Sequence, residues 1–294
     1  MSPVKTEPGS VRARPKRKAA AKGAPAKKKA AAKKKPAAKK KTPRKTAAKK
    51  APPAELGSRF RLGTLNWRRS LVFGAKAAFI FGLVFVTITG SWMVSYLFVN
   101  PPMTPLMLIR HFQDEEDIRN RWRSYDEVSP EFILAVVAAE DQLFFKHNGF
   151  DVKQIRAAIE TRLEGGRLRG GSTISQQVAK NLFLWPGRSW IRKGLEVYFT
   201  VGIEFCWPKE RILEMYVNVA ELGPGIYGVE SAAQHYYHKS ASDLNRQESA
   251  LLAAVLPAPR SRSPIAPTVY LRERQAWILG QMHNLGGPVY LSAR

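Results

Sequence analysis

The chain has 294 residues, a formal net charge of +25 and one cysteine, Cys206. This length allows one sizeable domain with appendages, and a single cysteine excludes an intrachain disulfide framework. Residues 1–50 hold 20 Lys or Arg and one acid, whereas residues 51–294 hold 28 Lys or Arg and 22 acids. The part of the chain that can fold is therefore only mildly basic, and most of the charge belongs to the N-terminal segment.

Residues 1–53 consist almost entirely of Lys, Ala, Pro and Arg. Such a segment has no apolar face and its like charges repel one another, so we predict a disordered tail. Its charge suits non-specific binding to DNA by counterion release, or to an anionic lipid surface, where each Lys or Arg contributes about 1 kcal/mol. A solvated tail that only helps to fix membrane orientation is the third interpretation.

A linker at residues 54–76 leads to an uncharged, mostly apolar stretch at residues 77–99. As a helix this stretch is about 35 Å long, enough to span a hydrocarbon core of about 30 Å. It is too long, and begins too far from Met1, for a signal peptide. The basic excess before it predicts that the N-terminus lies inside and that everything after Asn100 lies outside, which in a bacterium is the periplasmic side. A buried core helix is the alternative.

Residues 101–294 are predicted to form one mainly α-helical domain. Helix starts are expected at Ser129-Pro130, Asp151, Gly170-Gly171-Ser172, Ser189, Pro208 and Asn245, and a last helix over residues 270–284. In the helix after Pro208, Glu214 and Asn218 are expected to be buried and to join helices rather than to react. No convincing run of alternating residues predicts strands, although residues 101–128 have room for a short extended piece.

Glu140 and Asp141 lie at the end of an apolar helical run. Adjacent helical positions point about 100° apart, so only one of the two can face a given cleft. A carboxylate at an apolar wall can have a raised pKa and act as a general acid or base near neutral pH. A solvated helix end is the plain alternative, but the aromatic residues, His147 and Gly149 that follow favour a site.

A glycine-led turn at residues 170–173 opens a helix that carries amides and a lysine. Ser172 and Thr173 can cap this helix, and the free N–H groups of a first turn favour an anion. Gln176 and Lys180 are four residues apart and share one face. Simple helix capping explains the same pattern, so the turn alone is a weak signal.

Arg188, Arg192 and Glu196 are also spaced by four and share one helical face. They form either an exposed ion-pair ladder or a cationic strip beside a second carboxylate, suited to a diphosphate leaving group. His235 and His238 are spaced like metal ligands, but no flanking acid or cysteine completes a set, so we predict no metal site there.

Five motifs occur together and in order: EDxxFFxHxGF from Glu140, GGSTISQQVAKN from Gly170, RKxxE from Arg192, KxxILExYVN from Lys209 and GPGIYG from Gly223. Over about residues 125–260 this set closely resembles the peptidoglycan glycosyltransferases, the lysozyme-like family 51 glycosyltransferases. KTG does not occur and SxxK occurs only at residues 2–5, in the basic tail, so no transpeptidase motif follows these five motifs and the resemblance is to the monofunctional, membrane-anchored members. It implies a lysozyme-like domain that polymerises lipid II into glycan strands and releases undecaprenyl diphosphate.

The resemblance also implies roles for individual residues. Glu140 matches the general base that deprotonates the acceptor 4-hydroxyl, and Glu196 matches a second essential acid on the donor side. The substrate-binding matches are Lys180, Arg188, Arg192 and Lys193 at the diphosphate, Ser172, Gln176 and Gln177 along the donor site, and Asp141, Phe144 and His147 in support of the first motif. No cofactor is implied as required, and assistance by Mg²⁺ at the diphosphate stays open. The implied partners are lipid II, the growing glycan chain and the membrane, with other cell-wall synthesis proteins left open.

Two geometric expectations follow from this resemblance. Inverting glycosidases hold two carboxylates about 6.5–9.5 Å apart. Because a sugar hydroxyl replaces the water here, we predict that the Glu140 and Glu196 carboxyls lie no closer. We also predict an exposed apolar surface near the cleft, within residues 101–128 or around residues 183–186, that dips into the membrane.

Two other functions stay open at this point. A lytic transglycosylase or lysozyme-type hydrolase needs one dominant acid and no diphosphate cradle, so the cationic strip argues against it. A membrane-tethered protein that binds DNA or anionic lipid through residues 1–50 would keep its function in Glu140→Gln and lose it when residues 1–50 are deleted.

Overall fold

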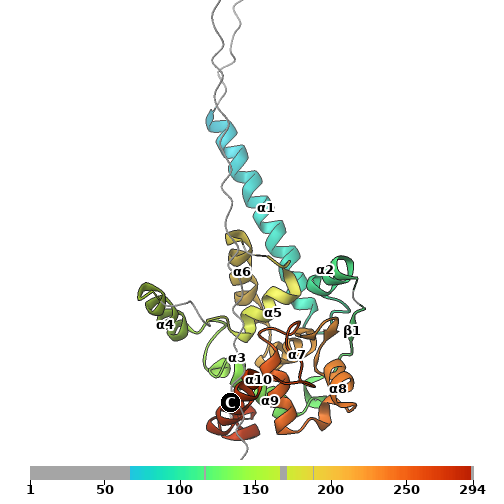
Figure 1. The fold of residues 1–294 in the computed structure, drawn as a ribbon. Helices are drawn as coiled ribbons and strands as arrows, with labels where there is room; N and C mark the ends of the chain where they lie inside the picture. Colours follow the sequence, from blue (N-terminus) through green and yellow to red (C-terminus); the bar gives the residue numbers. More distant parts are fainter. Residues whose placement is uncertain (1–66, 116, 166–170, 188, 293–294) are drawn as a thin grey trace, which may run out of the picture. The chain divides into compact units, whose positions relative to one another are not determined.

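The computed structural model describes residues 67–115, 117–165, 171–187 and 189–292. The predicted tail at 1–53, most of the linker at 54–76, Gly170 and Arg188 lie outside the described residues. The described part is mainly helical, which confirms the predicted fold class (Figure 1). Its helices are α1 (Trp67–Ser95), α2 (Pro105–Asp114), α3 (Pro130–Glu140), α4 (Val152–Leu163), α5 (Ile174–Phe183), α6 (Trp190–Cys206), α7 (Lys209–Val219), α8 (Val229–Tyr237), α9 (Arg246–Val255) and α10 (Val269–Asn284).

Helix α1 is long and apolar enough to cross a membrane. It begins at Trp67 rather than at residue 77, because the helix continues through the basic residues before the apolar stretch. It ends at Ser95 rather than at residue 99, and turns follow.

The C-terminal end of α1 is joined to α6. The Thr89 Oγ1 atom lies 2.7 Å from the hydroxyl oxygen of Tyr198, and the indole Nε1 of Trp207 donates to the Met93 carbonyl at 2.9 Å. A Cβ atom on Gly202 of α6 would overlap the Sδ and Cε atoms of Met93, so the glycine leaves room for the end of this side chain between the two helices. Most of α1 is exposed, but this end is part of the packed domain.

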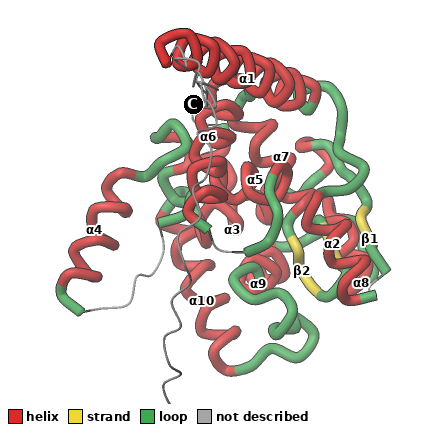
Figure 2. Tube along the Cα trace, turned by 90° about the horizontal axis from the view of Figure 1, so that it is seen from above, coloured by secondary structure: helices red, strands yellow, loops and turns green. Residues whose placement is uncertain are grey.

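Helix α3 forms the centre of the core. Residues 132–138 are all buried, and a helix that is apolar on every side belongs in the interior. Helices α9 and α10 pack against it, while α5 packs against α6 and α7. Because α3 ends at Glu140, the first polar side chain after this buried run emerges at the edge of the core. In contrast, α4 stands away from the other helices (Figures 1 and 2).

Several predicted helix starts are confirmed by their caps. Asp151 accepts the N–H of Gln154 at 2.9 Å before α4. Asn245 and Glu248 form a capping box before α9. Ser189 accepts the N–H of Arg192 at 3.1 Å before α6. Each of these side chains satisfies an amide that the helix itself leaves without a partner.

Three predicted starts differ in detail. The cap of α5 is Thr173, so this helix begins later than Gly170-Gly171-Ser172. The Ser129 hydroxyl does not cap α3, because it donates instead to the Leu244 carbonyl at 2.7 Å. Pro208 occupies the cap position of α7, and its first helical residue is Lys209.

A small sheet lies at the side of the domain where α2 and α8 are found (Figure 2). It contains β1 (Arg119–Asn120), β2 (Glu221–Gly223) and β3 (Ile226–Tyr227), in the order β1-β3-β2. Strand β1 is parallel to β3, and β2 is antiparallel to it. The extended piece expected within residues 101–128 is therefore confirmed, whereas the β2–β3 hairpin and the helices α2 and α8 were not predicted.

Asn218 on α7 ties this side of the domain together. It is fully buried, its Nδ2 donates to the Arg123 carbonyl at 2.7 Å, and its Oδ1 accepts the Arg123 N–H at 2.9 Å. Glu214 accepts the indole N–H of Trp122 at 3.1 Å. Asn218 is buried as predicted, whereas Glu214 is only partly buried, and both residues join α7 to the non-helical segment at 122–123 rather than to another helix.

Candidate active site

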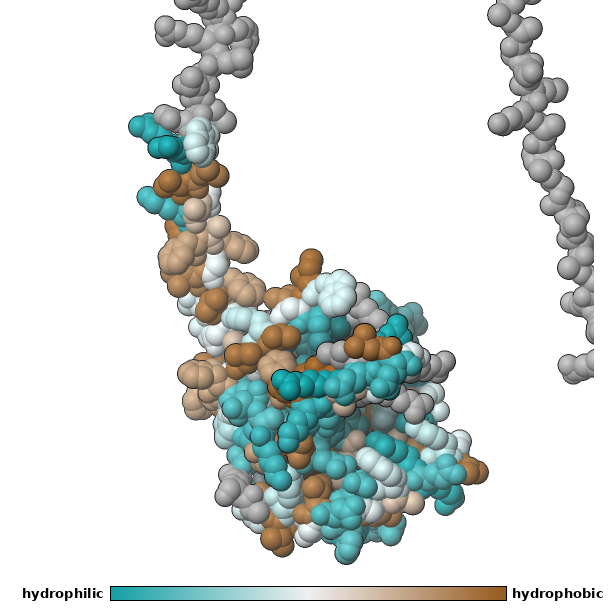
Figure 3. Space-filling view, turned by 90° about the vertical axis from the view of Figure 1, so that its left-hand side faces the viewer, coloured by the Kyte–Doolittle hydropathy of each residue, from teal (hydrophilic) through white to brown (hydrophobic). Residues whose placement is uncertain are grey.

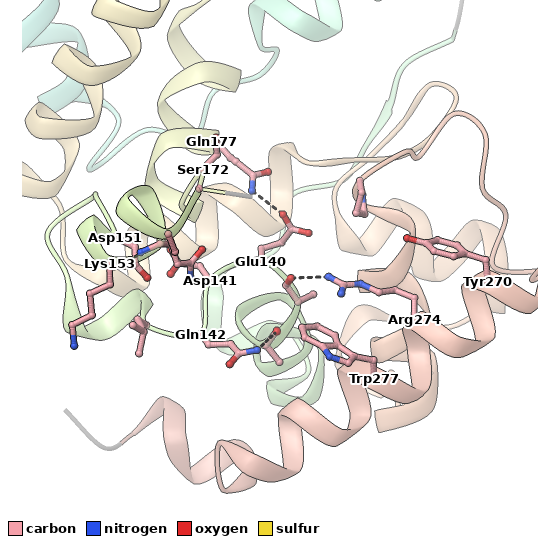
Figure 4. A pocket seen from close by; sticks show the side chains of 17 residues that line it. Glu140, Asp141, Gln142, Asp151, Lys153, Ser172, Gln177, Tyr270, Arg274 and Trp277 are labelled. Atoms are coloured by element: carbon pink, nitrogen blue, oxygen red, sulfur yellow. Dashed lines mark hydrogen bonds between the residues drawn. The ribbon is translucent and has the colours of Figure 1, made fainter. Parts of the chain in front are cut away.

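Glu140 lies at the C-terminal end of α3 beside a cleft of about 1160 Å³. In Figure 4 its carboxylate points between Gln177 on α5 and Arg274 on α10, with Asp151 and Lys153 on the opposite side of the cleft. Asp141, Ser172 and Gln177 line the same cleft. A cleft of this size is large enough for a sugar-sized ligand.

The environment of Glu140 suits a group that exchanges a proton near neutral pH. Burial raises the pKa of this carboxyl, and the nearby charge of Asp141 raises it further. A hydrogen bond from Gln177 Nε2 to Oε2 at 2.9 Å opposes this rise, as do the charges of Arg274 and Lys180. Competing influences of this kind are typical of general acids and bases.

Asp141 connects two segments inside the protein through hydrogen bonds. It is buried, its carboxylate lies 2.9 Å from Nε2 of His147, and it accepts the N–H of Ile174 at 3.1 Å. Phe144 is fully buried, with its ring beside His147 and under the ammonium of Lys209. These three predicted residues therefore join the end of α3 to the start of α5, and Phe144 supports the joint from within.

Gln176 also has a structural place. Its Oε1 accepts the Thr173 N–H at 3.0 Å, and Thr173 Oγ1 accepts the Gln176 N–H at 3.2 Å, which completes a capping box. Gln176 is buried and, among the described residues, is not part of the cleft wall. Gln176 therefore caps its own helix instead of facing a ligand together with Lys180, as was predicted. The next residue, Gln177, lines the cleft.

The cationic strip is built around Glu196 on α6. This carboxylate is only 4% exposed and forms ion pairs with Arg192, at 3.2 Å, and with Lys193. Because both of its oxygens have cationic partners, Glu196 holds these cations in place rather than standing as a free acid. Arg188, the fourth predicted cation of this group, lies outside the described residues.

Lys180 on α5 is close enough to Glu140 and to Glu196 for its charge to interact with both carboxylates. Burial of its side chain lowers its pKa, while the charges of Glu196 and Glu140 both raise it. Its side chain keeps contact with solvent, and it forms no ion pair in the part of the chain that the structure describes. No hydrogen bond joins Glu140 and Glu196 within the described ranges, since each carboxylate has other partners. The predicted separation of the two acids itself stays a prediction.

The α10 side of the cleft was not predicted from the sequence. Arg274 donates to the Ala139 carbonyl at 3.0 Å and stacks on Trp277, with its Cζ 4.1 Å from the ring centre. Tyr270 lines the same wall. Arg274 and Tyr270 are four residues apart, and Trp277 is three further on, so one helical face carries all three. This spacing was visible in the sequence, but nothing local connects it to Glu140.

The predicted apolar surface is present, but its position is only partly as expected. Leu108 and Phe112 of α2 are exposed, and so is Trp185, whereas Leu184 is buried and Phe183 is buried against Phe199 and Trp92. Most of the surface lies on α6, which was not predicted; its exposed apolar residues are Trp190, Ile191, Val197, Val201 and Phe205. Figure 3 shows apolar side chains along α1 and again beside it on the domain.

Comparison with known proteins agrees with this arrangement. A model of the transglycosylase family matches residues 107–283, more than half of the chain. A biosynthetic peptidoglycan transglycosylase from Xanthomonas campestris pv. campestris (strain B100) is 47% identical over 232 residues, which cover 77% of this chain and 93% of that protein. Proteins of the same name from Shewanella oneidensis and Pseudomonas fluorescens are 47% and 49% identical, over 73% and 66% of this chain and 93% and 83% of their own lengths. The chain therefore belongs to the transglycosylase family.

Proposed function

We propose that this chain is a membrane-anchored peptidoglycan glycosyltransferase that polymerises lipid II into glycan strands during cell-wall synthesis. Family membership supports the reaction class, and the relatives named above carry the name of this activity. The observation that carries the proposal is that the charge of Lys180 interacts both with Glu140 and with Glu196. A proton acceptor and a cationic cradle are thus adjacent in one site.

The proposed reaction is a single displacement with inversion at the anomeric carbon of the growing chain. Glu140 takes the proton from the 4-hydroxyl of lipid II, and that oxygen forms a bond to C1 of the donor sugar. The bond from C1 to the diphosphate oxygen breaks, and its electron pair leaves with undecaprenyl diphosphate. Lys180, Arg192 and Lys193 meet the negative charge that develops there, as preorganised cations do in other phosphate-releasing enzymes.

The α10 side of the cleft is the proposed acceptor side. Glu140 lines this cleft, whereas Lys180, Arg192 and Lys193 are not among the described residues that form its walls. An acceptor hydroxyl that enters along Arg274 and Trp277 would meet the base directly and approach the donor from the side opposite the diphosphate. This is the in-line arrangement that inversion requires.

The experiment uses the purified full chain in lipid vesicles with labelled lipid II. Glycan strands made by the wild type and by Glu273→Gln, an exposed carboxylate control on α10, but not by Glu140→Gln, are expected. Release of fragments from preformed peptidoglycan would instead support a hydrolase. Activity that survives in Glu140→Gln and disappears when residues 1–50 are deleted would support function through the tail, by binding of DNA or anionic lipid.

The proposed location is the bacterial inner membrane, with a cytoplasmic N-terminus and a periplasmic catalytic domain. The basic residues that precede α1 favour this orientation. Cysteine substitutions on either side of α1, tested with a thiol reagent that does not cross membranes, would measure it. The reaction as written needs no cofactor, so a chelator is expected to leave strand synthesis intact, and loss of activity that Mg²⁺ restores would assign the ion to the diphosphate.

A further inference from the structure

Tyr216 is a buried residue of α7 whose hydroxyl is connected to the site. It is only 2% exposed, and its hydroxyl donates to Oε1 of Gln177 at 3.3 Å. The Nε2 atom of the same amide donates to Oε2 of Glu140 at 2.9 Å. Two hydrogen bonds in series, which we call the Tyr216 relay, therefore join the interior of the domain to the carboxylate.

The direction of the relay depends on Tyr216. A glutamine amide presents an acceptor on one side and a donor on the other, and turning it over exchanges the two. An ionised carboxylate only accepts, so Gln177 stabilises it only when Nε2 faces Glu140. In the reverse orientation Oε1 would face the carboxylate, and the Tyr216 hydroxyl would lose the one acceptor that it has in the described part of the chain. Leaving a buried donor without a partner is costly, so the hydroxyl fixes the amide.

Tyr216 keeps its proton under working conditions. Burial raises the pKa of its hydroxyl well above the ordinary value, and the charge of Glu140 adds to this effect. The relay therefore has a permanent donor at its inner end and, while Glu140 is ionised, an acceptor at its outer end.

We propose that Tyr216 is a positioning residue for Glu140, acting through Gln177 to hold the carboxylate ionised and directed into the cleft. This inference rests on the proposed function, in which Glu140 is the base.

Other groups also face Glu140 and must be separated from the relay. Arg274 on α10 and Lys180 on α5 favour the ionised carboxylate, while Asp141, next to it in the chain, disfavours it. None of these three forms a hydrogen bond with Tyr216 within the described residues. Replacing Tyr216 by Phe keeps the buried ring and removes only the donor, so the other groups stay as they are.

The test is the pH dependence of strand synthesis by the full chain in vesicles. In Tyr216→Phe the amide loses its fixed orientation, and the carboxylate loses part of the stabilisation of its ionised form. The acidic limb of kcat/KM is then expected to move up by about one pH unit, a loss of about tenfold at the acidic end, with little change on the alkaline plateau and in KM. A purely structural effect would lower the rate equally at every pH.

Two further variants make the test specific. Tyr236→Phe removes a partly buried hydroxyl that donates to the Leu222 carbonyl at 3.2 Å in the sheet region, and it should keep the wild-type profile. If Tyr216 acts through Gln177, the double variant Tyr216→Phe/Gln177→Leu should be no slower than Gln177→Leu alone. Additive losses would overturn the relay.

The outcomes separate the relay from the proposed function. A wild type that makes no strands from lipid II contradicts the proposed function. An active wild type with an unshifted acidic limb in Tyr216→Phe contradicts the relay alone. If Tyr216→Phe loses its cooperative melting transition, the pH profile of Gln177→Leu replaces its own as the test, because that variant removes the other half of the relay. An unshifted acidic limb in Gln177→Leu would then overturn the inference.

Discussion

The imidazole Nε2 of His147 lies 2.9 Å from Oδ1 of Asp141, and the second oxygen of this carboxylate accepts the N–H of Ile174. One buried side chain thus connects the chain after α3 to the first turn of α5. Since Glu140 immediately precedes Asp141 and its partner Gln177 lies on α5, this connection sets the position of the base relative to its hydrogen-bond donor.

Asp141→Asn should therefore lower both stability and turnover. The amide oxygen can accept from only one of the two partners, and the NH₂ group then faces either the Ile174 N–H, which cannot accept, or His147 Nε2, which accepts only after a change of tautomer. The expected loss is about 1–3 kcal/mol in the free energy of unfolding. Thermal melting in detergent would measure it, with Asp243→Asn as an exposed control. Equal melting temperatures for the two variants would contradict a stabilising connection through Asp141.

Gly149 and Gly165 offer a matched pair of substitutions. Both have a left-handed backbone, with φ of +85° and +83°. A Cβ on Gly149 would lie 2.8 Å from Thr200 Cγ2 and 3.0 Å from Glu204 Cγ, whereas a Cβ on Gly165 meets nothing within 4 Å. Gly165→Ala should therefore cost only the left-handed strain of about 1–2 kcal/mol, and Gly149→Ala clearly more. Melting temperatures that fall by the same amount would show that the crowding at Gly149 relaxes freely.

Glu140→Gln is expected to abolish strand synthesis and yet to stabilise the protein at neutral pH. The folded-state pKa of Glu140 is raised, so this group contributes most stability when protonated, below its unfolded pKa. That contribution is lost as the pH rises through the folded-state pKa, and a neutral glutamine does not lose it. The melting temperature of the variant should exceed that of the wild type at pH 7 to 8, by about 2–4 °C for each kcal/mol, and the difference should shrink toward pH 4. A melting temperature of Glu140→Gln below that of the wild type at pH 8 would contradict the predicted stabilisation.

The exposed apolar face of α6 should contact lipid. Trp190 is 92% exposed and, with its neighbours on α6, would otherwise be an unusually apolar surface in water. In a Cys206→Ser background, a polarity-sensitive dye attached to Trp190→Cys should shift to shorter emission wavelengths in vesicles. The same dye on Val289→Cys, a position that is 71% exposed near the C-terminus, serves as the control. Identical emission from both sites would mean that the α6 face stays in water.

Local pattern predicted much of the fold and of the site. The apolar run before Glu140 and the capping residues Asp151 and Asn245 determine their helices through contacts within one or two turns. The spacing of Arg192 and Glu196 placed them on one face because helical geometry is repetitive. The residues that local rules placed best are therefore those whose partners are near in sequence.

The errors have equally specific causes. Gln176 was predicted to face a ligand, but its amide is used by a capping box, which is a local competitor for the same side chain. Arg274 was missed because its contact with the Ala139 carbonyl spans 135 positions in the sequence. Only the packing of α10 against α3 brings Arg274 to this carbonyl, and the spacing of residues within a helix or a strand does not predict such a contact.

The junction between α1 and the catalytic domain has a practical consequence. Trp92 of α1 packs edge-on against Phe183 and Phe199, and Trp207 is bonded to the Met93 carbonyl. Cutting the chain after Asn100 would therefore uncover aromatic rings that are covered in the complete protein. Inhibitor screens with such a shortened enzyme would use a protein with an additional exposed apolar surface. Compounds that bind to this surface would not bind to the complete protein.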